Sequence, residues 1–372
     1  MALFREQRRI LGRWVLREGC RVRDFFPGGG SLPTLMNLPR RILIIRPFFL
    51  GDILLCLPLA QAIKHQSPET HLAWLLRDEW RTLLENHSVI DEVISFSPSK
   101  KMHPSIASRE FLRVVHELRQ RSFDLVLNLS WDRSSILWSW FSGAKVRVGI
   151  EEYGRPRLLS LLYTTTVIAP ERLKDDRPMA DFYYEPLRLL GFGPRAENPK
   201  VFATKEEQHF VDHRINEAFG NNNPFLLIHP GGRLGYKRWP VDRFAELIQR
   251  LGELHFYPLI LVCGPGEESW TASLTSVLPR NRSLFWPAPS LGEFIALSSR
   301  ATLFIGNDSG PMHLAAASGC RVVTIFGNHS SRWGPLGSDH RVFHGGHHLT
   351  SVSTESVLEG ILEMLKKPRR AF

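Results

Sequence analysis

Short apolar runs alternate with amphipathic segments along most of the 372-residue chain. The first run, residues 42–45, reads ILII and has no polar position, as expected of a parallel strand that is covered on both faces. Further apolar runs predict strands at residues 72–76, 89–96 and 125–129, and helical spacing predicts a helix over residues 111–120. Strands that alternate with helices indicate an α/β domain with a parallel sheet.

A second round of this alternation begins at residues 225–228, which read FLLI, after a Pro- and charge-rich stretch over 151–198 to which we assign no element. Two rounds predict two doubly wound, Rossmann-like α/β domains. Their ligand-facing loops are expected at the carboxyl ends of the strands, facing a cleft between the domains. In the second round we expect helices at residues 241–251, 291–298, 312–318 and 354–365 and strands at residues 259–262, 303–305 and 322–326.

These patterns also set the expected domain boundaries. Residues 41–200 form the N-terminal domain and residues 201–352 the C-terminal domain, followed by a helix and a basic tail over residues 353–372. The break between the domains is expected within residues 198–223, a stretch that runs into the loop sequence GNNNP.

The first 40 residues depart from this alternation and form an extension to the first domain. Residues 1–26 hold seven arginines against three acids, and apolar residues recur at helical spacing. The spacing predicts a basic amphipathic helix, followed by a flexible Gly-rich joint at residues 27–31. Such a helix either lies on an anionic membrane surface or packs on the protein's own surface, and the sequence leaves both open.

Composition is that of an ordinary globular protein, with 43% hydrophobic and 23% charged residues. No apolar run approaches the ~20 residues that span a bilayer, and arginines interrupt the apolar stretches near the N-terminus, so we expect a cytoplasmic protein. The net charge of +10 predicts a polyanionic neighbour: nucleic acid, an anionic membrane or a phosphorylated substrate. Without a P-loop, a GxGxxG after a strand or an HExxH, the sequence argues against NTPases, ordinary dinucleotide-binding enzymes and zincins.

Residues 307–313, NDSGPMH, carry the strongest chemical signal. A strand is expected to end there, and a helix of small residues begins with a proline near its first position. Unpaired N–H groups at such a helix start bind phosphate, while Gly310 allows close approach of a ligand and Ser309 can donate its hydroxyl. Asp308 either caps the helix or hydrogen-bonds sugar hydroxyls, because a carboxylate repels a diphosphate. The alternative is a simple capped helix without a ligand.

Residues 229–240, HPGGRLGYKRWP, form a loop between an expected strand and an expected helix. Its three glycines and three cations suit an anionic ligand. Lys237 and Arg238 could neutralise a leaving diphosphate in place of a metal ion. The alternative is a basic surface loop in which Trp239 and Pro240 fix the start of the next helix.

Two acidic residues follow other expected strands. Glu267, in the sequence GPGEE, could hold ribose hydroxyls. Asp52 lies at the start of a helix, where it is either an N-cap residue that contributes about 1 kcal/mol or a general base that takes the proton of an acceptor hydroxyl. The residues alone leave these two interpretations even. Four histidines between residues 340 and 348 have no Cys or carboxylate at metal-ligand spacing, so we expect no metal site there.

Taken together, three segments resemble the ADP-heptose:lipopolysaccharide heptosyltransferases, glycosyltransferase family nine. They read RILIIRPFFLGDILLCLPLAQAIK, HPGGRLGYKRWPVDRFAELI and IGNDSGPMHLAAASGCRVVTIFGNHSSRWGP, and the resemblance extends from Arg40 to about Leu365. It implies a GT-B fold with an acceptor-binding N-terminal domain, a donor-binding C-terminal domain, and inverting transfer without a metal or other cofactor. The family's catalytic aspartate falls on Asp52 and its phosphate-binding lysine on Lys237.

The expected function is therefore transfer of heptose from ADP-heptose to a phosphorylated lipopolysaccharide core acceptor, in the cytoplasm or on the inner face of the inner membrane, without nucleic acid as a partner. Alternatives are another nucleotide sugar, a different glycan acceptor, a GT-B-fold sugar-nucleotide epimerase, or a non-catalytic binding protein. The expected acceptor-binding residues are Arg46 and Gly51, and the expected donor-binding residues are Gly231, Gly232, Lys237, Trp239, Glu267, Asp308, Ser309, Gly310 and His313.

The chain departs from the family pattern at three places. Residues 1–26 precede the usual start, Asn128 stands where an acid is common, and residues 344–349 lack the cysteines of many members. None of these touches the donor loop, but the first two leave the acceptor as the weakest inference.

Overall fold

The computed structural model describes residues 13–17, 20–24, 39–97, 105, 108–151, 158–168, 177–195, 198–220, 223–327, 331–336, 339–346 and 348–368. The chain folds into two compact units, Met1–Glu197 (unit 1) and Asn198–Phe372 (unit 2). This division lies at the start of the break expected at residues 198–223. Part of that expected break is the helix α7 (Lys205–Phe219), which begins with a capping box between Thr204 and Glu207.

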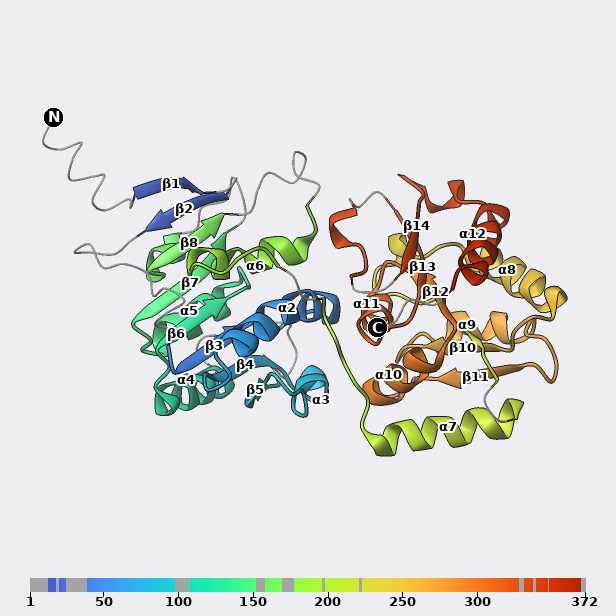
Figure 1. The fold of residues 1–372 in the computed structure, drawn as a ribbon, viewed down its shortest axis with the longest axis horizontal. Helices are drawn as coiled ribbons and strands as arrows, with labels where there is room; N and C mark the ends of the chain where they lie inside the picture. Colours follow the sequence, from blue (N-terminus) through green and yellow to red (C-terminus); the bar gives the residue numbers. More distant parts are fainter. Residues whose placement is uncertain are drawn as a thin grey trace, which may run out of the picture. The chain divides into compact units, whose positions relative to one another are not determined.

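Unit 1 contains an eight-stranded sheet in the order β1-β2-β8-β7-β6-β3-β4-β5. The neighbouring strands from β8 to β5 are parallel, while β1 and β2 add an antiparallel pair at the β8 edge (Figure 1). The strands are β1 (Arg13–Arg17), β2 (Cys20–Asp24), β3 (Arg41–Ile45), β4 (His71–Arg77), β5 (Glu92–Phe96), β6 (Leu125–Asn128), β7 (Val146–Glu151) and β8 (Thr165–Ile168).

The helices of unit 1 differ in how they are buried. The 17-residue helix α2 is apolar on most sides, and it packs beside α6 (Figure 1). The helix α4 is amphipathic, and its buried residues share a core cluster with Leu43 and Ile45 of β3 and Trp138 of α5. The helices are α2 (Leu50–Gln66), α3 (Arg81–Leu84), α4 (Arg109–Arg121), α5 (Arg133–Phe141) and α6 (Met179–Leu189), with short 3-10 turns η2 (Asp78–Trp80) and η3 (Leu158–Leu162).

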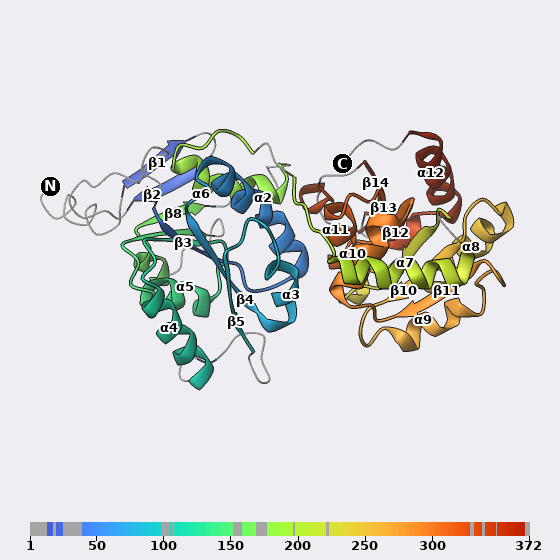
Figure 2. The same cartoon turned by 60° about the horizontal axis from the view of Figure 1, so that its bottom comes forward.

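Unit 2 contains a six-stranded parallel sheet in the order β11-β10-β9-β12-β13-β14. Its core joins Ile228 and Ile305 of the central strands to side chains of α8 and α12. On another part of the unit, α7 packs beside α10 (Figure 2). The strands are β9 (Leu226–His229), β10 (Leu259–Cys263), β11 (Ser283–Pro287), β12 (Leu303–Asn307), β13 (Val322–Phe326) and β14 (His340–His344). The helices are α7, α8 (Val241–Leu254), α9 (Glu268–Thr275), α10 (Leu291–Arg300), α11 (Gly310–Ala317) and α12 (Thr354–Lys366), with η4 (Gly235–Lys237), η5 (Ser331–Trp333) and η6 (Leu349–Ser351).

The prediction of two Rossmann-like α/β domains is confirmed, because each unit is built on a parallel sheet with intervening helices. Each apolar run expected as a strand contains a strand, although the one expected at residues 89–96 begins only at Glu92, and those at 125–129 and 225–228 each extend one residue beyond the strand. The unassigned stretch 151–198 contains β8 and α6. Among the described residues, no helix is both long and apolar enough to span a membrane.

The helix predicted for residues 1–26 is wrong in the part that the structure describes. Arg13–Arg17 and Cys20–Asp24 are strands, and β2 pairs with β8 over Arg21 to Asp24. Spacing within a short segment could not reveal this, because pairing with a strand more than a hundred residues away decides the conformation. The rest of the predicted helix lies outside the described residues.

Candidate active site

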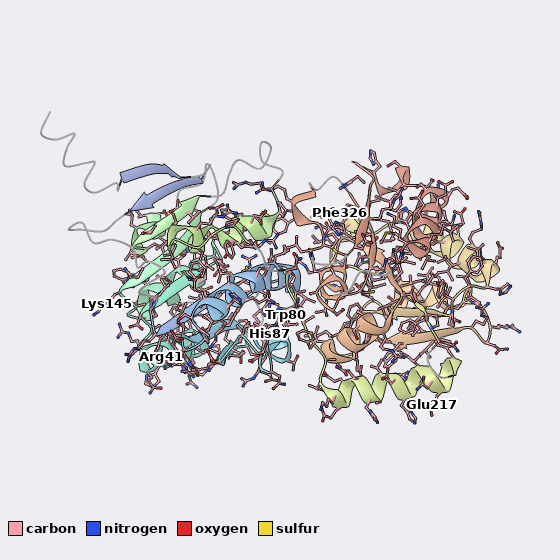
Figure 3. The ribbon with its side chains drawn as sticks, in the orientation of Figure 1. Arg41, Trp80, His87, Lys145, Glu217 and Phe326 are labelled. Carbon is pink, nitrogen blue, oxygen red and sulfur yellow. The ribbon has the colours of Figure 1, made fainter. Side chains whose placement is uncertain are left out.

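Three loops of unit 2 meet at the carboxyl edge of its sheet. Parallel pairing places Gly306 of β12 opposite His229 of β9, so the loops that follow these strands leave from the same edge. The loop after β10 starts from this edge too, because β10 pairs with β9 in parallel. Phe326, labelled in Figure 3, marks the same edge as the last residue of β13, which pairs with β12. The two segments that the sequence marked as a donor site, residues 229–240 and 307–313, are thus neighbours in unit 2.

Asn307 joins these two segments. Its side chain is fully buried, and Oδ1 accepts a hydrogen bond from the Trp239 N–H at 3.0 Å. Nδ2 donates to the carbonyl oxygens of Pro230 at 2.5 Å and Gly231 at 3.2 Å. Sequence reasoning included Asn307 in its motif without a role. The structure assigns it the role of holding the glycine loop against the start of α11.

Lys237 and Asp308 form an ion pair across the same two loops. The Lys237 Nζ lies 2.6 Å from Oδ2 of Asp308. The sequence left open that Asp308 caps α11, but Ser309 occupies the N-cap position, so that interpretation is wrong. An ammonium group has three N–H donors, so this contact leaves Lys237 with capacity for an anion as well.

Ser309 is the N-cap residue that precedes α11, but its side chain does not cap the helix. Its side chain makes no capping hydrogen bond, which contradicts the alternative of a simple capped helix. In the described part of the chain the buried Oγ has no hydrogen-bond partner. The first N–H groups of a helix also lack intrahelical partners, and the helix dipole favours negative charge there. This helix start can accept an anionic oxygen.

Glu267 holds the glycine loop in place through hydrogen bonds to its backbone. Its carboxylate accepts hydrogen bonds from the N–H groups of Gly232 at 2.7 Å and Gly264 at 2.8 Å. Nε2 of His229 lies 3.4 Å from Oε2, at ion-pair distance but without hydrogen-bond geometry. A Cβ on Gly231 would lie only 1.8 Å from Oε2, so this close approach requires glycine.

These contacts stabilise the ionised form of Glu267. Burial opposes ionisation, but the His229 imidazole and the two backbone N–H groups outweigh it and lower the pKa of Glu267 from 4.5 to about 2. The carboxylate that sequence reasoning assigned to ribose is thus occupied by the loop backbone, and ribose binding stays a prediction.

Trp239 is a core residue. Its side chain is fully buried, and the indole Nε1 donates to the Val352 carbonyl at 3.0 Å. The ring packs edge-on against Phe244 of α8, with 5.0 Å between centroids. The hydrophobic effect places the indole in the core, and donor binding by Trp239 stays a prediction. The alternative interpretation, that Trp239 fixes the start of the next helix, fits these contacts.

The remaining expected donor residues lie in the same region. His313 is buried in the first turn of α11, where its N–H approaches the Ser309 carbonyl at 3.5 Å. Gly310 is the first residue of that helix, ahead of Pro311. No group of three or more His, Cys, Asp or Glu side chains that could hold a metal ion is found within the described ranges.

In unit 1, Asp52 lies in the first turn of α2 and forms a buried ion pair. Its Oδ2 lies 2.7 Å from Nη2 of Arg46, and Oδ1 accepts a hydrogen bond from the Tyr183 hydroxyl at 2.8 Å. The N-cap interpretation of Asp52 is wrong, because Phe49 occupies the N-cap position and makes no side-chain capping hydrogen bond. Gly51, expected at the acceptor, precedes Asp52 in this turn and is partly buried.

Arg46 faces the interior, and acceptor binding by Arg46 stays a prediction. It is 4% exposed, and Nη1 donates to the Leu129 carbonyl at 2.7 Å. Its guanidinium lies over the rings of Trp131 and Tyr183, at 5.4 and 4.9 Å from their centroids. Burial, the largest single effect, lowers the pKa of Arg46, but its neighbours, Asp52 first among them, together outweigh burial, so the pKa lies above its ordinary value. Arg46 therefore remains a cation that balances Asp52.

The backbone before α2 is strained. Phe49 has a φ of 65°, in the left-handed region that side chains other than glycine rarely adopt. Its carbonyl accepts the N–H of Ile53 at 3.1 Å, which closes the first turn of α2. Such strain persists only where surrounding contacts impose it, and it is often found at functional sites. No sequence signal pointed to Phe49 or to Tyr183.

The chain has relatives of known type. The sequence pattern of the family described as glycosyltransferase family 9 (heptosyltransferase) matches residues 111–361. Lipopolysaccharide heptosyltransferase 3 of Escherichia coli K12 is 25% identical over 288 residues, which are 74% of this chain and 79% of the relative. Lipopolysaccharide heptosyltransferase 1 of Campylobacter coli is 25% identical over 320 residues, 77% of this chain and 84% of the relative.

Solved structures share the fold. A glycosyl transferase family 9 protein from Veillonella parvula superposes with a TM-score of 0.76 at 22% identity, covering 88% of this chain and 97% of that one. The ADP-heptose heptosyltransferase II of E. coli gives a TM-score of 0.72 at 21% identity, covering 87% and 98%. Since the family pattern extends over more than half of the sequence, this chain is a glycosyltransferase and belongs to family 9, the heptosyltransferases.

Proposed function

We propose that the protein transfers heptose from ADP-heptose to a lipopolysaccharide core acceptor, with inversion and without a metal ion. The observation that carries the donor half is the buried, unpartnered Oγ of Ser309 at the start of α11, within the described residues, beside the loop of Lys237. Relatives support the substrate class. Two solved structures of the E. coli heptosyltransferase WaaC, at 18% and 20% identity, contain ADP and ADP-2-deoxy-2-fluoro heptose.

On the donor side, Lys237 and the start of α11 bind the diphosphate. The Nζ of Lys237, the Ser309 hydroxyl and the first N–H groups of the helix stabilise the negative charge that develops as the diphosphate leaves. Asp308 fixes the lysine through their 2.6 Å contact. This arrangement supplies positive charge that a metal ion provides in other transferases.

On the acceptor side, Asp52 is the general base. The acceptor oxygen forms a bond to the anomeric carbon, the bond from that carbon to the diphosphate breaks, and the diphosphate leaves with the electron pair. The acceptor proton passes to Asp52. In this proposal unit 1 binds the acceptor and supplies the base, and unit 2 binds the donor.

The direct test is product formation by the full chain. Purified protein is incubated with ADP-heptose and heptose-deficient lipopolysaccharide, and the mass of the lipid product is measured by mass spectrometry. We expect one added heptose per acceptor, release of ADP, and the same rate in the presence of a metal chelator. A rate abolished by the chelator contradicts metal-independent transfer. Consumption of donor without acceptor identifies an epimerase or hydrolase instead.

A thermal-shift panel separates the choice of nucleotide from the choice of acceptor. ADP is expected to raise the unfolding temperature more than UDP, GDP or CDP at the same concentration, because only a ligand that binds the folded state stabilises it. If another nucleotide gives a larger shift, the proposed donor changes to a sugar carried by that nucleotide, and the glycosyltransferase class is unaffected.

We further propose that the reaction takes place on the inner face of the inner membrane. The net charge of +10 favours both a phosphorylated acceptor and an anionic lipid surface. Flotation with vesicles containing anionic lipid tests this, comparing the intact chain with one that lacks residues 1–26. Equal recovery of both forms excludes these residues as the contact, and no recovery of either excludes the membrane surface.

A further inference from the structure

Three separate elements converge on the carboxylate of Asp52. Arg46 follows β3, Asp52 lies in the first turn of α2, and Tyr183 lies on α6. Tyr183 is 131 residues from Asp52 in the sequence and reaches it because α6 packs beside α2 (Figure 1). The contact therefore exists only in the folded protein.

The two partners take one oxygen each. Arg46 pairs with Oδ2 at 2.7 Å, and the Tyr183 hydroxyl donates to Oδ1 at 2.8 Å. A carboxylate has about four lone-pair directions, so these contacts leave others for a proton. Because both oxygens are engaged, the carboxylate cannot rotate about its χ2 torsion without breaking a buried interaction.

Tyr183 is suited to donate this hydrogen bond throughout the working pH range. Its side chain is fully buried. Burial, the largest effect, raises the pKa of Tyr183 well above 10, and Arg46 lowers it only in part. The hydroxyl therefore keeps its proton. The titratable and charged groups that act on this cluster are Arg46, Asp52, Tyr183 and Cys56, and burial keeps Cys56 as a neutral thiol because it raises the pKa of that group.

We propose that Tyr183 is the positioning residue of the base, orienting the Asp52 carboxylate so that a fixed lone pair faces the acceptor hydroxyl. The proposal rests on the proposed function, because it takes Asp52 as the base. Tyr183 itself contacts no reacting atom.

The test is Tyr183→Phe in the full chain, which removes the hydroxyl and keeps the ring that contacts Arg46. A hydrogen bond to a charged group contributes about 1.5–3 kcal/mol, so kcat is expected to fall about 10- to 100-fold. The KM for ADP-heptose stays within about twofold, because unit 2 binds the donor in this proposal.

Tyr163→Phe is the matched control. Tyr163 is also a buried tyrosine of unit 1, and its hydroxyl accepts a hydrogen bond from Nδ2 of Asn128 at 2.6 Å. This variant loses a buried hydrogen bond of similar length and is expected to lose a similar amount of stability. Its kcat is expected to stay close to that of the wild type. A kcat that falls equally in both variants overturns the proposal, because loss of stability then explains the effect.

A double-mutant cycle separates positioning from an independent role. In an Asp52→Asn background, Tyr183→Phe is expected to change the residual rate by less than about twofold, because the group it orients is gone. A further 10-fold loss in that background overturns the positioning role. If Asp52→Asn alone retains full activity, the base assignment fails and the positioning role fails with it. If the wild-type chain transfers no heptose while ADP still stabilises it, the error lies in the proposed acceptor or sugar, and the cycle is repeated with the sugar and acceptor that the chain does use.

Discussion

The charged groups around Asp52 in unit 1 contact one another, whereas Lys237 in unit 2 lies beside a helix start that can accept an anionic oxygen. In unit 1, Arg46 is 4% exposed and pairs with one carboxylate oxygen of Asp52, and the Tyr183 hydroxyl donates a hydrogen bond to the other. In unit 2, the Lys237 side chain is 22% exposed, and the buried Ser309 Oγ has no partner among the described residues. In unit 1 both carboxylate oxygens of Asp52 are engaged by protein groups, whereas the cluster in unit 2 leaves capacity for a ligand.

This difference matches the tasks that we propose for the two regions. A base has to keep its charge and its orientation between turnovers, and buried partners provide both. A phosphate site has to accept charge from outside, so its donors stay available while the backbone that carries them is fixed. Glu267 and Asn307 supply that fixation through contacts to the glycine loop. The comparison predicts that substitutions in unit 1 affect catalysis most, while those in unit 2 affect donor binding most.

The largest effect is expected for Asp52→Asn. Loss of the general base lowers kcat by about 10²- to 10⁴-fold, while the thermal shift produced by ADP stays unchanged. Asp91→Asn is the matched control, because Asp91 forms a more exposed ion pair with Lys64 in the same unit. Circular dichroism of both variants checks that they fold. Turnover of Asp52→Asn within about threefold of wild type would falsify the base assignment.

The next effect is expected for Lys237→Ala. Removing the ammonium group lowers kcat/KM for the donor by about 10²- to 10³-fold and weakens the thermal shift produced by ADP. Arg243→Ala tests whether any lost cation has this effect, since Arg243 forms an exposed pair with Glu246 on α8. Donor kinetics that are equally affected in both variants would mean that the net charge of unit 2, and not Lys237, governs binding.

An intermediate effect on stability is expected for Glu267→Gln. An amide nitrogen cannot accept a backbone N–H, so one of the two loop contacts is lost at about 1–3 kcal/mol. The pKa of Glu267 is lowered from 4.5 to about 2, so its carboxylate stabilises the fold fully above pH 4.5 and loses this contribution as the pH falls toward 2.

Thermal unfolding across this pH range checks the prediction for Glu267. The unfolding temperature of the wild type is expected to fall more steeply between pH 4.5 and 2 than that of Glu267→Gln. If the two plots of unfolding temperature against pH are parallel, the carboxylate of Glu267 does not stabilise the loop through these two N–H contacts.

The smallest effect is expected for Ser309→Ala. The buried Oγ has no partner among the residues that the structure describes, so its removal leaves the unfolding temperature unchanged or slightly higher. The same removal lowers ADP affinity by a few fold, because a hydrogen bond to phosphate is lost. Titration calorimetry with ADP measures this. Loss of stability without loss of affinity would reverse the comparison between the two units.

Local sequence patterns predicted much of the fold. Runs such as residues 42–45 and 303–305 are apolar on both faces, and a buried parallel strand is the structure that such runs favour. The same logic failed for residues 1–26, where the described part forms strands β1 and β2. The pairing partner of β2 lies in the unassigned stretch, so no local pattern contained that information.

The candidate site divides in the same way. The segment 307–313 was recognisable because a strand end, a helix start, glycine and polar residues lie within seven positions. The burial of Trp239 was not predicted, because a position two residues from Lys237 in the sequence does not place both side chains on one surface. Tyr183 was missed because its partner is 131 residues away.

The sequence by itself determined the alternation of strands and helices, the loops at strand ends and the family. These follow from periodicity and from short motifs, which are local properties of the chain. Only the tertiary structure decided which polar groups are paired: Asp52 with Arg46 and Tyr183, and Glu267 with the glycine loop. Burial makes an unpaired charge costly, so the partners are fixed by packing between distant segments and not by neighbours in the sequence.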